Sequence, residues 1–91
     1  MGKIYHTTIQ TLLGEMLACA SDLGLCLLEF NGQKGLEREL AQVRRELGED
    51  WIDERNVWLV QTDRELAEYF AGKRKQFDVP LHFVGTAFQQ Q

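Results

Sequence analysis

The sequence predicts an α+β domain, with a small antiparallel three-stranded sheet and helices packed on one of its faces. Two observations carry this prediction. Short apolar or β-branched runs separated by turn residues fill the first third of the 91-residue chain, which is typical of a meander of strands. After residue 35 the apolar side chains recur at helical spacing, and helices segregated from a meander are typical of the α+β class.

Three strands are expected before residue 31. Residues 4–9 are rich in β-branched and aromatic side chains, which favour a pleated, half-buried surface. Residues 15–20 are ambiguous on their own. The turn at 21–24 is clear, because it contains the Asp and Gly that tight turns use. Residues 25–30 are a short apolar run between turns, which predicts a strand and places 15–20 as its neighbour in the meander.

Two helices are expected to follow. Apolar side chains share one helical face in residues 36–47, and Gly48 behind them is a typical helix stop. A second helix is expected from about residue 56 to residue 71, although residues 57–60 would suit a strand equally well. Residues 49–55 are interpreted as a charged connector that carries two apolar side chains.

A last extended segment is expected at residues 77–84. It contains the only proline, Pro80, which pushes the residue before it towards extended geometry. Apolar side chains alternate with other residues on both sides of the proline. This pattern suits an edge strand, because proline lacks the N–H that an inner strand donates.

Composition excludes several classes of protein. A hydrophobic content of 44% argues against disorder. The net charge of −4 argues against a stand-alone nucleic-acid binder, so any contacts with DNA are expected from another part of the protein. No stretch approaches the roughly 18 apolar residues of a membrane span, so no membrane partner is expected. Residues 1–10 do not look like a signal peptide, and the two cysteines cannot form a disulfide framework, which favours a cytoplasmic location.

Several motifs occur in a specific order. Leu-Ala-Glu-Tyr-Phe-Ala-Gly at 66–72 precedes Phe-Asp-Val-Pro-Leu at 77–81 and Gly-Thr-Ala-Phe-Gln at 85–89, and Thr-Thr-Ile and Leu-Gly-Glu stand near the start of the chain. Together they resemble the amino-terminal domain of the methylated-DNA–protein-cysteine methyltransferases, also called O6-alkylguanine-DNA alkyltransferases. Leu12 is a departure, because the family usually has proline there.

The resemblance implies a ribonuclease-H-like fold and a role in DNA repair. Such an enzyme flips O6-alkylguanine out of duplex DNA and transfers the alkyl group irreversibly to a cysteine of a Pro-Cys-His-Arg motif in its carboxy-terminal domain. This sequence contains no such motif, so no catalytic residue and no cofactor are assigned, and the chain is expected to be inactive alone. Its expected partners are its own catalytic domain and, through that domain, alkylated double-stranded DNA. Residues 1–84 are expected to form the amino-terminal domain, and residues 85–91 the start of the linker or first helix of the catalytic domain.

The cysteines, Cys19 and Cys26, lie in apolar runs, so we expect them to pack in the core and not to react. Together with His6 and His82, the two cysteines have the residue types of a structural zinc site, but they do not have the sequence spacing of its ligands. Some family members carry zinc in this domain. The resemblance aligns Gly2, Ser21 and Cys26 with three of their ligand positions, so most of the ligand set is absent and no metal site is assigned.

The acidic residues offer another alternative, because ribonuclease-H-like nucleases hold two metal ions with carboxylates. The residues concerned are Asp50, Asp53, Glu54, Asp63, Glu65 and Glu68. They are expected on helical surfaces and a connector, so we interpret them as a solvated face. The only basic cluster, Lys73-Arg74-Lys75, either complements the end of the second helix or contacts a phosphate in the full protein.

The aromatic residues of the second half are either core or a ligand cradle. Trp58, Tyr69, Phe70 and Phe77 are at spacings that favour the core, with some facing a neighbouring domain. Phe83 and Phe88 are the best candidates for such an interface.

Three functional hypotheses follow. The preferred one is the structural, non-catalytic domain of a DNA-repair methyltransferase. The second is a stand-alone domain that binds a partner or self-associates through an exposed apolar face. The third is a small metal-dependent nuclease, against which the first strand's lack of carboxylates argues.

Overall fold

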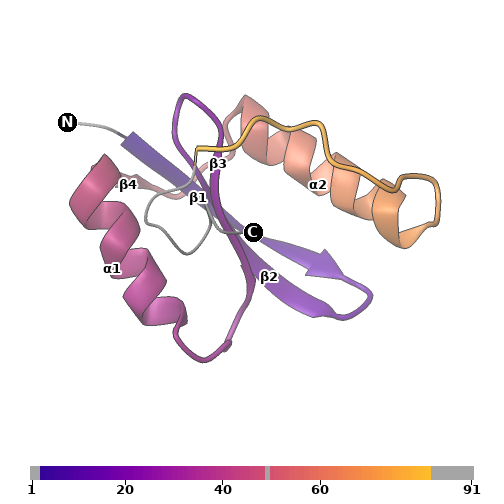
Figure 1. The fold of residues 1–91 in the computed structure, drawn as a ribbon, viewed down its shortest axis with the longest axis horizontal. Helices are drawn as coiled ribbons and strands as arrows, with labels where there is room; N and C mark the ends of the chain where they lie inside the picture. The colour runs from indigo at the N-terminus through magenta and orange to yellow at the C-terminus, as the bar shows by residue number, and fades with distance from the viewer. Residues whose placement is uncertain (1–2, 49, 83–91) are drawn as a thin grey trace.

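The computed structural model describes residues 3–48 and 50–82, and within these ranges three strands are followed by a helix, a fourth strand and a second helix (Figure 1). The elements are β1 (Lys3–Thr11), β2 (Gly14–Ala20), β3 (Leu25–Phe30), α1 (Leu36–Leu47), β4 (Asp50–Ile52) and α2 (Val57–Phe70). The predicted first and third strands and both helices are confirmed, and the ambiguous residues 15–20 belong to β2.

The sheet is mixed and has the strand order β3-β2-β1-β4. The pairs β1–β2 and β2–β3 are antiparallel, whereas β4 lies parallel to β1, with Ile4 opposite Trp51. The prediction of three antiparallel strands was therefore incomplete, because residues 50–52 are a strand and not part of a connector. A strand of three residues beside acidic neighbours is too short to show the alternation that reveals longer strands.

The two helices cover opposite faces of the sheet, so the prediction that both pack on one face was wrong. Successive side chains of a strand point to opposite faces. On β2, Met16 and Ala18 pack in the core cluster of α2, whereas Leu17 and Cys19 pack in the core cluster of α1. Apolar residues at consecutive positions, as in Leu-Cys-Leu-Leu at 25–28, are typical of a strand that is buried on both faces.

The start of α2 is tied to the turn between β2 and β3. The Asn56 side chain accepts a hydrogen bond from the backbone N–H of Leu59 at 3.0 Å, which caps the helix, and donates one to the Ser21 carbonyl at 3.0 Å. An Asn cap satisfies a helix N–H that has no partner within the helix, which resolves the ambiguity of residues 57–60 in favour of a helix.

Residues 73–82, which we call the strap, run back along α2 to β3 (Figure 1). Their backbone pairing with the sheet is one parallel bridge between Leu25 and Leu81, made by hydrogen bonds of 2.8 Å from Leu25 N to Pro80 O and from His82 N to Leu25 O. The edge strand predicted at 77–84 is thus reduced to this bridge, and residues 83 and 84 lie outside the described residues. Neither described helix has the length and apolar character needed to span a membrane.

Candidate domain interface

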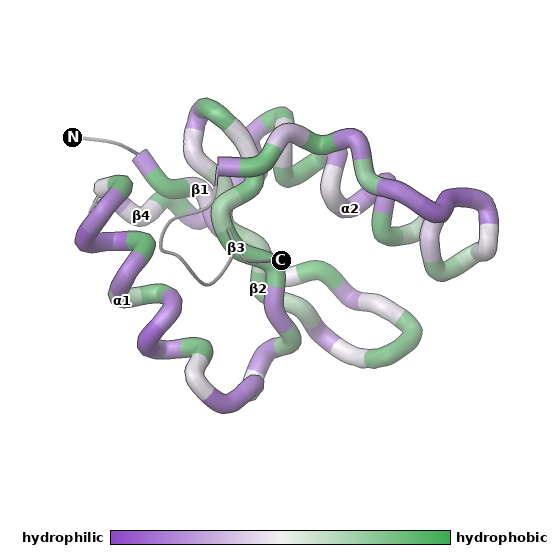
Figure 2. Tube along the Cα trace, viewed as in Figure 1, coloured by the Kyte–Doolittle hydropathy of each residue, from purple (hydrophilic) through white to green (hydrophobic). Residues whose placement is uncertain are grey.

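The exposed large apolar side chains of the described residues lie on the β1–β2 hairpin, the β2–β3 turn, α2 and the strap. The turn between β1 and β2 carries two of them, Leu12 and Leu13, which are 82% and 72% exposed, and Figure 2 shows this hydrophobic tip extending away from α1. The others are Leu23, Val57, Val60, Tyr69, Phe77 and Leu81. In the part of the chain that the structure describes, none lies on α1 or β4. Clustered exposed apolar side chains mark surfaces for protein contacts.

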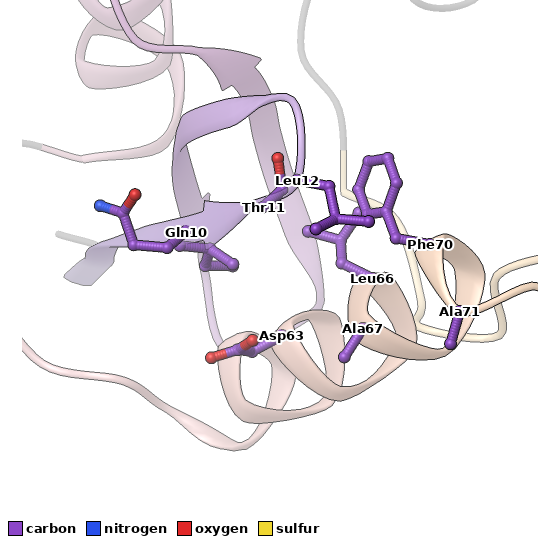
Figure 3. Close-up of a pocket in the computed structure, with 9 residues that line it drawn as sticks. Gln10, Thr11, Leu12, Asp63, Leu66, Ala67, Phe70 and Ala71 are labelled. Carbon is purple, nitrogen blue, oxygen red and sulfur yellow. The ribbon is translucent and has the colours of Figure 1, made fainter.

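A groove of about 380 Å³ lies between this hairpin and the second half of α2 (Figure 3). Leu12 points from the hairpin toward Leu66 and Phe70, and the small residues Ala67 and Ala71 leave the helix side of the groove open. Ile9, Gln10, Thr11 and Asp63 complete the lining. Since most of the lining is apolar, the groove suits an apolar side chain.

The one ionisable residue of the groove, Asp63, is engaged within the domain. It forms a salt bridge with Arg55. Arg55 also donates hydrogen bonds of 3.0 Å to the Thr7 hydroxyl and to the Thr8 carbonyl on β1. Both charged side chains are more than one third exposed, so this pair contributes little to stability, but it fixes the side of α2 that faces β1.

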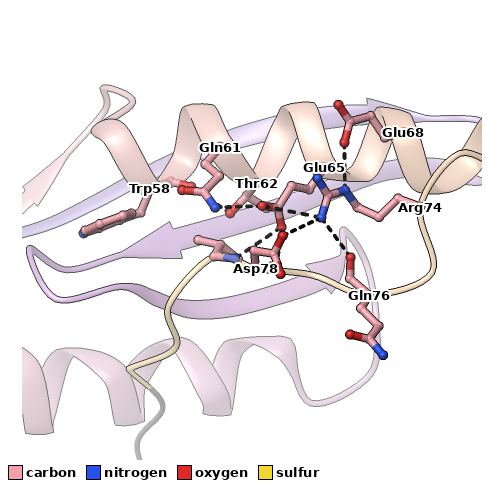
Figure 4. A network of polar contacts seen from close by, with 9 residues as sticks. Trp58, Gln61, Thr62, Glu65, Glu68, Arg74, Gln76 and Asp78 are labelled. Atoms are coloured by element: carbon pink, nitrogen blue, oxygen red, sulfur yellow. Dashed lines mark hydrogen bonds and ion pairs between the residues drawn. The ribbon is translucent and has the colours of Figure 1, made fainter.

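The strap is fastened to α2 by a buried carboxylate, Glu65 (Figure 4). It accepts hydrogen bonds from the backbone N–H groups of Asp78 at 2.9 Å and Val79 at 3.3 Å, and from the Gln61 amide at 2.7 Å. Burial alone would raise the pKa of Glu65, but these bonds and the nearby Arg74 guanidinium outweigh it and lower the pKa below its usual value. The interpretation of Glu65 as part of a solvated face was therefore wrong, because the strap folds over it.

Arg74 belongs to the same network. It donates to the Glu68 carboxylate at 2.7 Å, to the Asp78 carboxylate at 3.1 Å and to the Gln76 carbonyl at 3.1 Å. The hydrogen bonds to Glu68 and Asp78 raise the pKa of Arg74. Arg74 therefore organises the strap, while its neighbours Lys73 and Lys75 are exposed. Contact of this basic cluster with a phosphate stays a prediction.

The far end of the strap is held by the turn between β2 and β3. His82 Nδ1 lies 2.6 Å from the Ser21 hydroxyl oxygen, which also accepts a hydrogen bond from Leu23 N at 3.0 Å. Gly24 has a φ of +156°, and a Cβ placed there would lie 2.4 Å from the Pro80 carbonyl oxygen. Only glycine allows the strap to approach this turn so closely.

The cysteines behave as core residues, as predicted. Cys19 and Cys26 are fully buried and free. Burial raises the pKa of Cys19 to about 12, with a smaller contribution from the neighbouring Cys26, and burial also raises the pKa of the Cys26 thiol. A reactive cysteine needs a lowered pKa, so neither thiol is prepared to act as a nucleophile.

The residues of the zinc and nuclease alternatives are dispersed. His6 packs edge-on against Trp51, with ring centroids 5.3 Å apart, whereas His82 contacts Ser21. Asp63 and Glu68 pair with Arg55 and Arg74, respectively. Within residues 3–48 and 50–82, no three His, Cys, Asp or Glu side chains are grouped so that they could hold a metal ion.

The four aromatic residues divide between core and surface. Trp58 and Phe70 pack against the α2 core cluster, and Trp58 Nε1 donates to the Asp22 carbonyl at 2.8 Å. Tyr69 and Phe77 are exposed, and their ring centroids lie 5.5 Å apart. The predicted interface residues Phe83 and Phe88, and the segment 85–91, lie outside the described residues.

Known proteins share this architecture. Residues 4–83 match the ribonuclease-like domain of 6-O-methylguanine DNA methyltransferase. The constitutive methylated-DNA–protein-cysteine methyltransferase of Bacillus subtilis is 32% identical over an alignment of 97 positions, gaps included, and the alignment covers 96% of this chain and 49% of that protein. The enzyme of the same name from Methanosarcina barkeri is 32% identical over 88 residues, with the same two coverages.

A solved structure supports the fold. The crystal structure of the Mycobacterium tuberculosis O6-methylguanine methyltransferase superposes with a TM-score of 0.68 at 24% identity, covering 96% of this chain and 47% of that one. The chain thus spans about half the length of the curated relatives that it matches. Because the family match extends over residues 4–83, the chain belongs to the 6-O-methylguanine DNA methyltransferase family and corresponds to its ribonuclease-like domain.

Proposed function

We propose that this chain is the amino-terminal, non-catalytic domain of a DNA-repair methylated-DNA–protein-cysteine methyltransferase. The complete protein would remove alkyl groups from O6-alkylguanine in DNA: the carbon–oxygen bond to the base breaks, and a carbon–sulfur bond to a cysteine of the other half forms. The observation that carries the proposal is the match of residues 4–83 to the ribonuclease-like domain alone, with relatives about twice as long as this chain.

The chemistry of the described residues favours a structural, non-catalytic role. The thiols of Cys19 and Cys26 are buried and hold their protons at neutral pH, so neither is a suitable acceptor for an alkyl group. The net charge of −4 is unsuited to binding a polyanion. DNA binding is therefore assigned to the carboxy-terminal half, and alkylated double-stranded DNA becomes a partner only through it. Residues 1–84 would form the amino-terminal domain, and residues 85–91 would be the start of the linker or first helix of the catalytic half. The buried free thiols fit a location in the reducing cytoplasm.

The test compares this chain with the complete protein. Both are incubated with a DNA duplex that contains guanine with a radiolabelled O6-methyl group. We expect at most one methyl group on each complete molecule, bound to a cysteine of the carboxy-terminal half, and none on the 91-residue chain. Label on Cys19 or Cys26 would overturn the assignment of a non-catalytic role.

A further inference from the structure

We propose that Asn31 is a site of spontaneous covalent modification, at which the side-chain amide is lost as ammonia and a mixture of aspartyl and isoaspartyl residues forms. Asn31 and Gly32 lie in the turn that leads from β3 to α1, and both residues are exposed. The reaction needs only water and the chain itself, so it goes beyond the proposed function and does not depend on it.

The reaction begins at the backbone nitrogen of Gly32. This nitrogen loses its proton to hydroxide and attacks the side-chain carbonyl carbon of Asn31, and the new carbon–nitrogen bond closes a five-membered imide. The bond from that carbon to the amide nitrogen breaks, and the amide nitrogen takes a proton from water and leaves as ammonia. Water then adds to either carbonyl of the imide and reopens it, which gives an aspartyl or an isoaspartyl residue. One water is consumed for each ammonia released, and nothing is oxidised or reduced.

The turn leaves the attacking nitrogen accessible. The backbone groups on either side of it are paired, because Asn31 N donates to the Glu15 carbonyl at 2.9 Å and Gln33 N donates to the Phe30 carbonyl at 3.0 Å. Between them, the N–H of Gly32 donates no backbone hydrogen bond to any described residue. The φ of +87° at Gly32 favours glycine, so the turn itself selects the residue that hinders this attack least.

The other asparagine of the sequence, Asn56, provides a contrast within the chain. The residue that follows it is Val57, whose β-branched side chain hinders attack by its own backbone nitrogen. Both polar atoms of the Asn56 side chain are engaged, since the oxygen accepts from Leu59 N and the nitrogen donates to the Ser21 carbonyl, each at 3.0 Å. Ring closure at Asn56 would break the cap of α2, whereas at Asn31 it would break one hydrogen bond of an exposed side chain.

The product would weaken the end of the β2–β3 hairpin. The Asn31 amide donates to one carboxylate oxygen of Glu15 at 2.7 Å, and the other oxygen accepts from the Gln10 amide at 3.1 Å. A carboxylate at position 31 cannot donate this hydrogen bond, and it would bring a second negative charge beside Glu15. The two charges repel each other, although exposure to solvent keeps the repulsion small.

The test compares the two asparagines in the folded and in the unfolded chain. The 91-residue chain is incubated at neutral pH in buffer and in guanidinium chloride, and circular dichroism verifies that the chain in buffer is folded. Peptide mass spectrometry follows Asn31 and Asn56 separately and distinguishes isoaspartyl from aspartyl products. The variant Asn31→Gln is the matched control, because its longer side chain would have to close a larger and less favourable ring.

We expect Asn31 of the folded chain to convert at no less than about one tenth of its rate in the unfolded chain, because an exposed turn opens at little cost in free energy. Conversion of Asn56 should be about tenfold or more slower than that of Asn31, because the helix cap must open first. Conversion of Asn31 in the unfolded chain only, or at no higher rate than that of Asn56, would overturn the proposal. A product that contains no isoaspartate would also overturn it, because direct hydrolysis of the amide yields aspartate alone.

A second measurement tests the consequence for the hairpin. Asn31→Asp reproduces the aspartyl product and should lower the urea midpoint of the chain by about 0.3 M. Combining it with Glu15→Gln should restore most of this loss, because the new amide can donate to the carboxylate at position 31. An unchanged midpoint for Asn31→Asp, or a loss that Glu15→Gln does not reverse, would overturn the proposed effect of the modification on the hairpin.

Discussion

The two helices pack on the same sheet but differ in how much apolar surface they leave exposed. Helix α1 buries Leu36 and Val43 and presents charged side chains to water, so its layer is complete as it stands. Helix α2 buries Leu59 and Leu66 in the same way, yet it leaves Val57, Val60 and Tyr69 exposed on its other sides. The difference teaches that α1 hides its apolar side chains within this domain, whereas α2 leaves part of its apolar surface uncovered by the described residues.

The layers also differ in how they are attached. Around α1 the contacts are apolar, supplemented by the Arg44 guanidinium over the Trp51 ring at 4.7 Å. Two buried polar atoms there, Glu39 Oε1 and Trp51 Nε1, have no hydrogen-bond partner among the described residues. Around α2, both carboxylate oxygens of the buried Glu65 accept hydrogen bonds, one from two backbone N–H groups of the strap and the other from the Gln61 amide on α2. The α2 layer therefore depends on polar contacts that the α1 layer lacks.

The largest expected effect on the free energy of unfolding comes from removing the Glu65 carboxylate. Glu65→Ala should lower the free energy of unfolding by about 3 kcal/mol, because two strap N–H groups and the Gln61 amide lose their acceptor inside the protein. Glu65→Gln keeps one acceptor oxygen and should cost less. Urea unfolding of this chain measures both. The matched change on the other layer, Glu37→Ala, should stay within about 0.5 kcal/mol, and equal losses for Glu37 and Glu65 would contradict the comparison.

The contrast shows what the sequence could predict. Local patterns predicted both helices, because apolar spacing and the stop at Gly48 depend on neighbours along the chain. The position of Glu65 in the core could not be predicted, because it depends on the strap, whose N–H groups come from 13 and 14 residues further on. The consecutive apolar residues of β3 indicate a strand that is buried on both faces, so the placement of the helices on opposite faces was predictable. Strand β4 was not predictable, because three residues are too few to show an alternation of apolar and polar side chains.

A second prediction concerns a substitution that would push the strap away from the β2–β3 turn. Gly24→Ala should cost about 2 kcal/mol, since a Cβ would meet the Pro80 carbonyl and the φ of +156° is unfavourable for alanine. Hydrogen exchange at the amides of Leu25 and His82 should accelerate as their bridge opens. Gly14→Ala is the control, because its φ of +131° is also positive but nothing lies within 4 Å of the added carbon. Equal costs at both positions would mean that the strap is not held against the turn.

A third prediction uses pH to distinguish the layers. The pKa of Glu65 is lowered in the folded state, so its stabilisation is present above the unfolded pKa of about 4.3 and is lost as the pH falls through the folded pKa. The pKa of Glu29, on β3, is raised by burial and then by the nearby Glu39. Ionised Glu29 therefore destabilises the fold at neutral pH, and the penalty disappears as the pH falls through its raised pKa.

Urea unfolding at a series of pH values tests these opposite signs. Glu29→Gln should stabilise the chain by about 0.5 kcal/mol at pH 7, with no gain once the pH lies well below the pKa of Glu29, because the side chain is only partly buried. Glu65→Gln should instead reduce the loss of stability on acidification. Parallel pH profiles for the two variants would contradict the assignment of opposite pKa shifts to the two layers.

The candidate interface was only partly visible in the sequence. The pairing of apolar residues at 12 and 13 is evident, but their exposure follows from their place in a tight hairpin beyond the sheet. Aromatic residues at helical spacing predicted a core, and this was right for Trp58 and Phe70. It failed for Tyr69, because α2 covers the sheet with one face and Tyr69, the residue before Phe70, lies on another face of the helix.

The smallest expected effect tests whether the hairpin tip belongs to this domain's own core. Leu12→Asn should change the free energy of unfolding of this chain by no more than about 0.5 kcal/mol, because a side chain that is 82% exposed buries little surface on folding. Urea titration measures the change, with Leu59→Ala as the contrasting change at a fully buried position, where a loss of about 3 kcal/mol is expected. A loss above about 1 kcal/mol for Leu12→Asn would show that Leu12 closes the groove itself. The groove would then be part of the α2 core, and the asymmetry between the two layers would no longer point to a partner.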